Sequence, residues 1–576
     1  SAVAGGLLDM ASRCMVILAL ILSCGRAARA AGPSPGADVH PGLPQVEFIN
    51  QQLTAAWASD GVRPASDATD GEWCRRVHLD LIGRIPKLEE LKAFLADKSP
   101  SKRADLVARL LGEEYEDEYS RHWTDVWTTM LIGRDATNDL VNRSGMRQYL
   151  RRAFSKNIPY DRLMEELVTA TGVNANRKDL DGFNGATNFL SGKLGEMGDD
   201  KGLEATAKTA RIFLGLQVQC TQCHDHPLPP NQGKQNQFWE LNAFFRQARA
   251  LRRRGGTDDV QWIELVDEDF VGDQNDPEEA EIYYELRNGQ KRVAYPVFVD
   301  STAIPRSGFL PGTMEDGTRY GVNRRRELAT LIRTSPLFPK AAVNRMWGHF
   351  LGYGFTRPVD DLGEHNPPSH PELLDGLAER FRDGGFDLKE LARWIVLSRP
   401  YATSSRPSAS GPDDDPASGE KPKFARFYLR QMQAEELYES LLTATEADRA
   451  ARAEDAAKKK DEWLSQFVIA FGTDEGDEAT TFNGSIPQVL TMFNGDLIEN
   501  AVAIGKGGFL HRVAAAPLNS TARIETLYLA ALARKPSRTE LDVAKRLVAA
   551  RKGDAIGALQ DVWWAVLNSN EFIFQH

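Results

Sequence analysis

The spacing of apolar residues is the feature that most limits the fold of this chain, because two long helical patterns enclose one short strand pattern. From Val46 to about Ala250 the apolar residues recur every three or four positions, as on one face of an α-helix. The helical period resumes at Arg324 and continues to the end, whereas residues 258–300 alternate as short strands do. The pattern predicts a mainly α fold with two helical domains and a small β-ribbon insert.

The expected domains follow from these changes of period. We place one helical domain at 45–250, the β insert at 258–300 and a second helical domain at 321–576. A tract rich in Ser, Gly, Asp and Pro at 403–422 is predicted to be a disordered loop. A chain of 576 residues is too long for one compact core. The amphipathic stretches of the first domain lie near 45–58, 71–82, 87–97, 101–111, 115–131, 144–155, 160–170 and 203–220.

The N-terminal region is typical of an export signal. Arg13 precedes an apolar run from Met15 to Leu22, and Ala28-Arg29-Ala30 then forms a small-x-small cleavage site. The apolar run is too short to span a bilayer as a mature helix. We therefore expect a signal peptide at 10–30, a flexible linker at 31–44, and a protein exported to the periplasm or beyond.

Two further expectations concern membranes and nucleic acids. A lipid anchor on Cys24 is the alternative to soluble export, because Ile21-Leu22-Ser23-Cys24 loosely resembles a lipoprotein cleavage box. No segment after the leader resembles a transmembrane helix. The formal net charge of −11 argues against general binding of nucleic acid.

The segment Cys220-Thr221-Gln222-Cys223-His224 is the stretch that indicates a specific chemistry. C-x-x-C-H is the attachment signature of a c-type haem, with two thiols for thioether bonds and a histidine for the iron. At about 100° per residue, one α-helical turn would carry both sulfurs and the imidazole on one side. The motif predicts haem c bound covalently at Cys220 and Cys223, with His224 as an axial ligand.

Two other interpretations of the motif stay open. In one, Cys220, Cys223, His224 and His226 hold a zinc or iron ion, although neighbouring residues on an α-helix diverge by about 100°. In the other, no cofactor is bound, and the C-x-x-C pair forms a structural disulfide or a redox pair. Removal of the leader would leave Cys74 as a third cysteine, which we expect to be a buried, inert thiol.

Histidines elsewhere in the chain offer no obvious sixth ligand for a haem iron. His122, His349 and His370 are candidates only as histidines, and we expect each to be buried and hydrogen-bonded. A polar loop of the second domain could line a carbohydrate or metal site, but its Asn-Pro-Pro-Ser sequence favours a turn that caps the next helix. The acids and histidines of this loop are Asp360, Asp361, Glu364, His365 and His370.

One pattern occurs twice. Residues 84–91 and 534–541 share R-x-P-x-x-x-E-L, and each copy follows a Leu-rich helix and opens another. The arginine can serve the carbonyls that end one helix, while proline and glutamate suit the first turn of the next. We interpret both copies as structural and assign no chemistry to them.

Several blocks of the chain carry a family resemblance. The block Trp73–Pro86 and the block around Cys220–Pro227 resemble the planctomycete cytochrome-like domain. The planctomycete-specific domain that commonly follows it is similar to four later blocks, Ala342–His349, Pro358–Gly363, Asn366–Leu374 and Trp564–Phe572. This resemblance implies an exported bacterial protein with two domains of unknown function. Cys74 stands where the resemblance leads us to expect another residue.

These observations lead to one leading hypothesis about function and two alternatives. The leading hypothesis is an exported c-type cytochrome-like electron carrier, or a haem-bearing subunit of an exported assembly. One alternative is an extracellular hydrolase or binding protein for polysaccharide degradation with a non-haem metal at residues 220–226, and the other is a structural scaffold. Expected partners are other exported redox or polysaccharide-degrading proteins. The sequence does not decide whether the protein is an enzyme.

Overall fold

The computed structural model describes residues 42–576 except for short internal segments. The expected signal peptide, Cys24 and most of the expected linker lie outside the described residues. Of the tract 403–422, residues 409–413 also lie outside, whereas Asp414 is buried and Pro416–Ser418 form a short 3₁₀ turn. The internal segments not described are 135–137, 177–180, 195–201, 228–232, 256–259, 269–282, 305–321, 409–413, 451–452, 473–484, 505–506 and 552.

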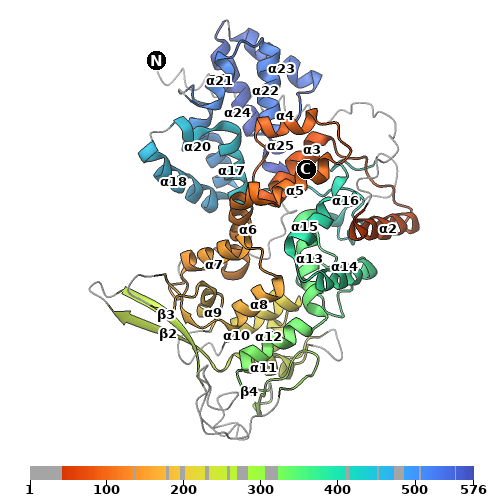
Figure 1. The fold of residues 1–576 in the computed structure, drawn as a ribbon, viewed down its shortest axis with the longest axis vertical. Coiled ribbons are helices and arrows are strands. Elements are labelled where there is room, and N and C mark those ends of the chain that lie inside the picture. The colour runs from red at the N-terminus through yellow and green to blue at the C-terminus, as the bar shows by residue number, and fades with distance from the viewer. Residues whose placement is uncertain are drawn as a thin grey trace.

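The described chain is mainly α-helical, as predicted (Figure 1). The helices of the first half are α2 (Pro44–Ser59), α3 (Asp70–Ile82), α4 (Leu88–Ala96), α5 (Lys102–Leu110), α6 (Glu116–Ile132), α7 (Arg143–Ser155), α8 (Tyr160–Thr169), α9 (Asn188–Ser191), α10 (Leu203–Thr209) and α11 (Gln235–Asn242). The first seven of these confirm the amphipathic stretches expected between residues 45 and 170. Their apolar stripes are long enough to specify a helix locally.

The second half is helical as well. Its helices are α12 (Arg324–Thr334), α13 (Leu337–Leu351), α14 (Pro371–Asp383), α15 (Leu388–Val396), α16 (Arg399–Ala402), α17 (Ala434–Thr445), α18 (Ala453–Phe471), α19 (Ile486–Asn494), α20 (Asp496–Val502), α21 (Phe509–Ala515), α22 (Ser520–Leu532), α23 (Arg538–Ala550), α24 (Ala555–Leu567) and α25 (Asn570–Ile573). Several begin at a side-chain cap, as α23 does at Ser537, whose hydroxyl accepts from the Glu540 amide.

The stretch expected to be helical at 203–220 ends earlier than predicted. Helix α10 continues as the π-helical segment η3 (Ala210–Leu214) and stops at Gly215, whose φ of 64° is a left-handed conformation that glycine adopts without strain. A Cβ at this position would lie 2.8 Å from the Leu362 side chain. Both backbone conformation and packing therefore end the helix at Gly215.

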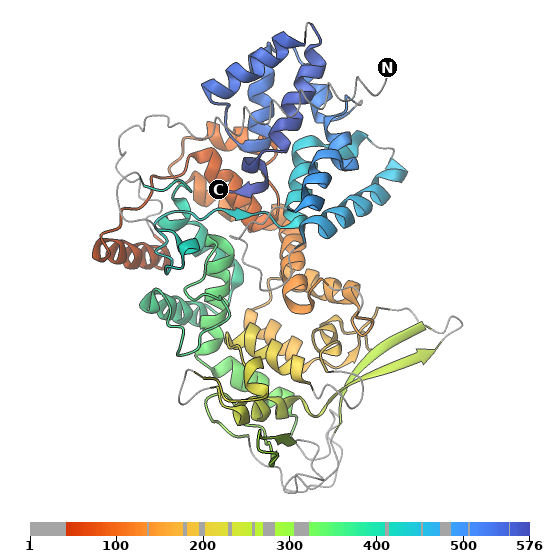
Figure 2. The same cartoon turned by 180° about the vertical axis from the view of Figure 1, so that it is seen from behind.

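The strands form small antiparallel sheets, and the largest begins before the expected insert. Strand β2 (Ala248–Gly255) pairs along its length with β3 (Val260–Asp267), and the short β1 (Gly172–Val173) joins the other side of β3. The β2–β3 ribbon projects from the body of the molecule (Figures 1 and 2). Farther along, β4 (Tyr283–Glu285) pairs with β5 (Lys291–Val293).

Two large hydrophobic clusters form most of the interior, and they divide near residue 430; a small third cluster contains Ala243, Tyr284 and Ala294. The first runs from Val46 to Tyr428, with Ala533 in addition, and so includes α12–α16 together with the first half. The second contains residues 432–572 and also Leu79 and Ile85 from the region of α3. Figure 1 accordingly shows α17–α24 together in the upper part, beside α3 and α4. Each cluster therefore contains residues from the other part of the chain: Leu79 and Ile85 belong to the second cluster, and Ala533 belongs to the first.

The C-terminus is anchored to α3. Strand β6 (Arg430–Gln431) pairs with β7 (Phe574–Gln575), and the guanidinium of Arg75 donates to the carbonyls of Phe572 (2.7 Å) and Ala531 (2.6 Å). Both ribbon views place the C-terminus beside α3 (Figures 1 and 2). The last residues of the chain are therefore fixed against α3.

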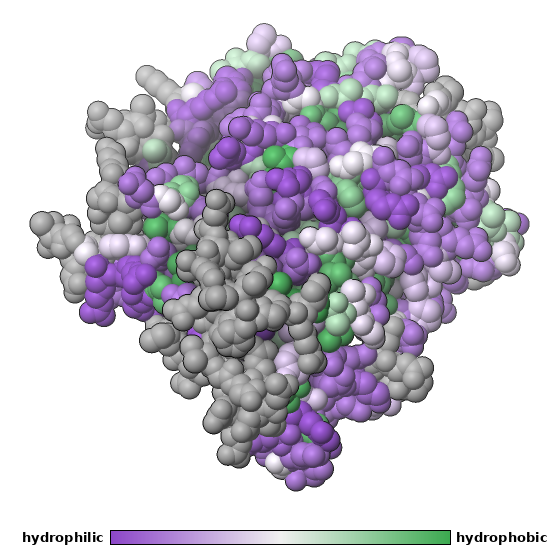
Figure 3. All heavy atoms as spheres, turned by 60° about the horizontal axis from the view of Figure 1, so that its bottom comes forward, coloured by the Kyte–Doolittle hydropathy of each residue, from purple (hydrophilic) through white to green (hydrophobic). Residues whose placement is uncertain are grey.

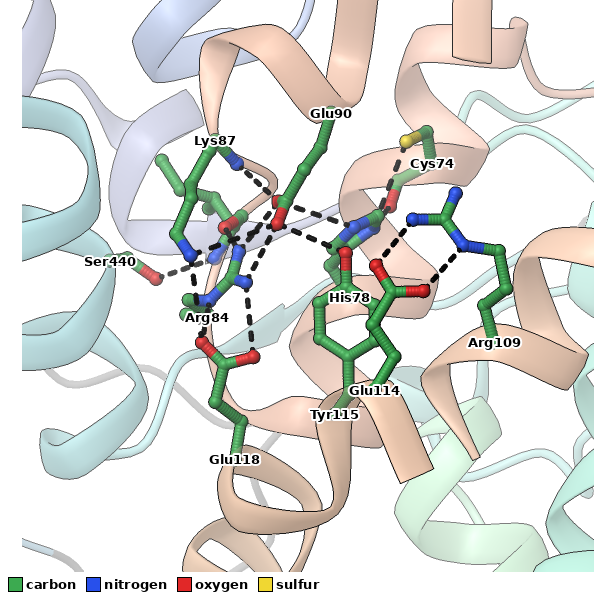
Figure 4. A network of polar contacts seen from close by, with 11 residues as sticks. Cys74, His78, Arg84, Lys87, Glu90, Arg109, Glu114, Tyr115, Glu118 and Ser440 are labelled. Carbon is green, nitrogen blue, oxygen red and sulfur yellow. Dashed lines mark hydrogen bonds and ion pairs between the residues drawn. The ribbon is translucent and has the colours of Figure 1, made fainter. Parts of the chain in front are cut away.

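The repeated R-x-P-x-x-x-E-L pattern builds the same cluster twice. Arg84 donates to the carboxylates of Glu90 (2.8 Å) and Glu118 (2.9 Å), as Figure 4 shows. It also donates to the carbonyl of Ile85 (3.0 Å). Arg534 makes the corresponding bonds to Glu540, Glu571 and the carbonyl of Lys535. The structural interpretation is confirmed, but each arginine serves two carboxylates rather than the carbonyls that end a helix.

The surface is predominantly polar on the face that Figure 3 shows, where hydrophobic residues are scattered among hydrophilic ones. Within the described part of the chain, no helix combines the length and the apolar character needed to cross a membrane.

Candidate functional site

The C-x-x-C-H motif lies on a 3₁₀ turn rather than on an α-helix. The turn, η4 (Gln219–Gln222), begins four residues after Gly215, and Cys223 follows it with right-handed helical dihedral angles. A 3₁₀ turn has three residues, so side chains three positions apart are eclipsed. Cys220 and Cys223 therefore project to the same side, although the α-helical geometry expected from the sequence is absent.

Both thiols and the imidazole of the motif are accessible. Cys220 and Cys223 are free and exposed. The Nδ1 of His224 lies 2.8 Å from the carbonyl oxygen of Asp225, an arrangement in which Nδ1–H donates. That hydrogen bond fixes the tautomer and leaves the lone pair on Nε2, the nitrogen that commonly binds metal ions.

Helix α11 holds the turn in place. The carbonyl of Gln222 accepts hydrogen bonds from the Trp239 indole (3.0 Å) and the Gln235 side chain (3.2 Å). The Asp225 carboxylate accepts from the Gln235 amide (2.9 Å) and pairs with Lys234 (3.1 Å). The hydrogen bond from the backbone amide of Gln235 and the charge of Lys234 hold the pKa of Asp225 below its usual value.

A loop of the second half lies against the same segment. The amide of Leu362 donates to the carbonyl of Gly215 (2.7 Å), and Gln217 donates to Asp360 (3.0 Å). Arg211 forms an ion pair with the same carboxylate. Burial alone would raise the pKa of Asp360, but the hydrogen bond from Arg211 and the charge of Arg345 lower it. Asp360 is thus a charged anchor between the halves.

The structure brings two predicted histidines together. The ring of His226 packs on that of His365, with centroids 4.8 Å apart, and His365 Nε2 lies 3.0 Å from the Asp361 carboxylate. We expected the His365 loop to serve as a helix cap, so this contact was missed. The only local signal was the density of acids and histidines in the loop.

The other histidine candidates pack against aromatic side chains, among the residues that the structure describes. His122 and His349 have ring centroids 6.1 Å apart and both contact Trp123, and burial lowers the pKa of His122 to about 3. His370 packs against Phe424, and its Nδ1 lies 2.9 Å from the Ser369 hydroxyl. Burial is confirmed for His122, whereas His349 and His370 are half-buried, and the Nε2 atoms of His122 and His349 have no hydrogen-bond partner among the described residues.

Metal-binding geometry is a separate question. In the part of the chain that the structure describes, no group of three or more His, Cys, Asp or Glu side chains is arranged to hold a metal ion. Occupation of Cys220, Cys223, His224 and His226 by zinc or iron stays a prediction.

Comparison with known proteins identifies two domains. Residues 48–250 match the family model PSCyt2, "Protein of unknown function (DUF1549)", and residues 324–548 match PSD1, "Protein of unknown function (DUF1553)". The chain matches no curated protein and no solved structure. It therefore carries, in this order, a PSCyt2 domain and a PSD1 domain, two planctomycete-type domains of unknown function.

Proposed function

We propose that this protein is an exported, c-type cytochrome-like protein that carries haem on Cys220 and Cys223. Its role is electron transfer, alone or as the haem-bearing subunit of an exported assembly. The observation that carries the proposal is the exposed turn with two free thiols on one side, followed by a histidine whose Nε2 is available. The sequence of the leader supports it, because haem is attached to such motifs outside the cytoplasm.

The residues present fit the chemistry of this cofactor. Thioether bonds require reduced thiols that a macrocycle can approach, and Cys220 and Cys223 meet this requirement. An axial histidine requires a free Nε2 and a partner for Nδ1, which the Asp225 carbonyl provides for His224.

Each residue then has a defined role. Haem supplies one-electron redox chemistry when it is bound. Cys220 and Cys223 hold it, and the Asp225 carbonyl orients the His224 ring. The bond from Trp239 to the Gln222 carbonyl keeps the shape of the turn, so that the thiols and the imidazole keep their relative positions.

Covalent attachment tests the proposal directly. The full chain is produced in an exporting host that has haem-attachment machinery. We expect red protein with a c-type pyridine haemochrome band and haem retained through denaturing electrophoresis. Cys220→Ala and Cys223→Ala should each abolish two-bond attachment, whereas the buried Cys74→Ala is the matched control and should retain it. Colourless wild-type protein would contradict the proposal.

The second candidate is an extracellular hydrolase or binding protein for polysaccharide degradation, with zinc or iron at residues 220–226. The contact of His226 with His365, whose Nε2 lies 3.0 Å from the Asp361 carboxylate, favours this candidate because it places a second imidazole and a carboxylate beside the proposed ligand His226. Colourless protein with stoichiometric zinc or iron would support it. Colourless, metal-free protein that is destabilised by Cys220→Ala would instead indicate the structural scaffold.

A further inference from the structure

A loop of the second domain is fastened to the segment that leads to the C-x-x-C-H turn. The loop comprises residues 360–366, and the amide of Leu362 within it donates to the carbonyl of Gly215 (2.7 Å). Asn366 braces the loop from within, because its side-chain amide donates to the carbonyl of Asp361 (2.9 Å). The backbone of Asp361 is therefore held in a defined place next to this segment.

The carboxylate of Asp361 orients the imidazole of His365. One carboxylate oxygen lies 3.0 Å from Nε2 of His365, an arrangement in which Nε2–H donates to a charged acceptor. Both side chains are largely covered, with 13% of Asp361 and 24% of His365 exposed. Water therefore competes little for this bond, and the His365 ring has one preferred orientation.

The ring of His365 in turn packs on His226. The two ring centroids are 4.8 Å apart and the planes are inclined by 31°, a separation typical of aromatic pairs. Gly233 also confines His226, because a Cβ added at Gly233 would lie 2.7 Å from the Cβ of His226. The same added Cβ would lie 3.6 Å from Thr221, the residue that follows Cys220 in the turn. His226 thus contacts both the second domain and a residue that packs against the turn.

The position of His226 fixes the hydrogen-bond acceptor of His224. Asp225 is the one residue between these histidines, and its carbonyl accepts from Nδ1–H of His224 (2.8 Å). That carbonyl belongs to the planar peptide unit that joins Asp225 to His226, and the N–H of this unit donates to the carbonyl of Gly233 (2.7 Å). Because the unit is rigid, a displacement of His226 moves the acceptor of His224 with it.

We propose that Asp361, through His365 and His226, is a positioning residue for His224, so that the second domain takes part in the site around the C-x-x-C-H turn. The inference rests on the proposed function where haem is concerned, because a hydrogen bond from Nδ1–H to a fixed acceptor raises the basicity of Nε2 as an axial ligand. The positioning of the His224 ring itself does not depend on haem.

The hydrogen bond of His224 is measured first, in the full chain made without haem-attachment machinery. With nitrogen-15 histidine, NMR reports the tautomer of each ring at a pH at which imidazoles are neutral, and His224→Gln assigns the signal. We expect mainly the Nδ1–H tautomer of His224 in the wild type. His365→Ala and Asp361→Ala should each raise the ratio of the Nε2–H to the Nδ1–H form about fivefold, the effect of losing one hydrogen bond. His365→Phe keeps an aromatic ring against His226 and should give an intermediate ratio.

The reduction potential is measured next, in protein with haem attached. The variants keep both cysteines, so their covalent haem content should equal that of the wild type. At a fixed potential, His365→Ala should raise the ratio of reduced to oxidised haem about fivefold, because a weaker bond from Nδ1–H leaves the axial ligand less basic. Glu364→Gln, at an exposed acid of the same loop, is the matched control. It should leave the His224 tautomer unchanged and change the haem ratio less than Asp361→Ala does.

The two measurements separate the proposed function from the positioning role. If the wild type is colourless, the proposed function fails and the tautomer ratio alone decides the positioning role. An unchanged tautomer of His224 in His365→Ala overturns that role, whether or not haem is attached. Equal shifts of the haem ratio in Glu364→Gln and Asp361→Ala overturn it as well, since both acids would then act by charge alone. If His365→Ala folds poorly, His365→Phe supplies the comparison.

Discussion

Cysteine and histidine occur together in two regions of this protein, and the two regions differ in almost every physical property. Around η4, Cys220 and Cys223 are exposed, and His224 is oriented by one carbonyl. On α3, Cys74 is buried with its sulfur 3.7 Å from Nδ1 of His78, and that nitrogen also bonds the Cys74 carbonyl at 2.8 Å.

The difference arises from what surrounds each pair. His78 projects from α3 toward the residues that surround Arg84, with Nε2 3.7 Å from the Glu90 carboxylate (Figure 4). Burial and then the charge of Glu90 raise the pKa of the Cys74 thiol far above its usual value. A thiol in such a place is unreactive, whereas an exposed pair can be modified. The same residue types thus serve packing in one region and are available for chemistry in the other.

The largest expected effect is in thiol reactivity. In protein made without haem-attachment machinery, a maleimide should modify Cys220 and Cys223 at least about 1,000-fold faster than Cys74, because exposing a core thiol costs about 4 kcal/mol or more. Mass spectrometry of peptides after timed labelling measures the ratio. Comparable rates at all three cysteines would remove the distinction between the two regions.

The next effect concerns stability. Arg84→Ala should lower the free energy of unfolding by about 3 kcal/mol, because it leaves Glu90 and Glu118 facing each other without their buried cation. The Arg84 side chain is 3% exposed and that of Arg534 is 32% exposed, so Arg534→Ala in the second copy should cost less, about 1 kcal/mol. Cys220→Ala should stay within about 0.5 kcal/mol of the wild type.

Urea denaturation measures all three variants under the same conditions. Equal losses for Arg84→Ala and Arg534→Ala would show that burial does not separate the two clusters.

A third prediction uses the pH dependence of the buried region. Burial lowers the pKa of His78 from 6.5 to about 4, although the charge of Glu90 opposes this. Between these values the unfolded chain binds a proton that the folded protein excludes, so stability is complete above pH 6.5 and decreases toward pH 4. Two and a half pKa units correspond to roughly 3 kcal/mol. His78→Gln should remove this part of the slope, as measured by unfolding free energies at several pH values.

The control for this experiment is Cys220→Ala, which keeps every buried histidine and should reproduce the wild-type slope. An unchanged slope in His78→Gln would mean that His78 does not contribute to acid sensitivity.

The smallest effect is local to the exposed region. Trp239→Phe removes the hydrogen bond to the Gln222 carbonyl while it keeps an aromatic ring against Tyr284. The loss of one such bond is worth about 1 kcal/mol, or about fivefold in a local opening equilibrium. Hydrogen–deuterium exchange should therefore accelerate by that factor in residues 219–226, with no change in α3. Acceleration in both regions would show that the turn and the core open together.

Local signals predicted much of the fold. Helices α2–α8 lie within one or two residues of the expected stretches, because each carries a continuous apolar stripe and several have capping residues at their ends. The duplicated arginine pattern was also recognisable. Its partners Glu118 and Glu571 were not, because they come from helices that only the fold brings beside Arg84 and Arg534.

The candidate site was predicted less completely. Cys220, Cys223 and His224 were identified from their spacing, but the α-helical geometry was wrong because Gly215 ends the preceding helix. The contact of His226 with His365 joins the two family domains, and no periodicity within either domain predicts it.

By itself, the sequence determined the helical architecture, the likeness to an export signal and the spacing of the C-x-x-C-H motif, since each depends on residues that are neighbours in the chain. Only the tertiary structure decided which cysteines reach solvent, which histidines meet and where buried cations gather. The physical reason is that burial and charge pairing depend on segments far apart in sequence. Cys74 and Cys220 differ in their surroundings, and folding alone creates those surroundings.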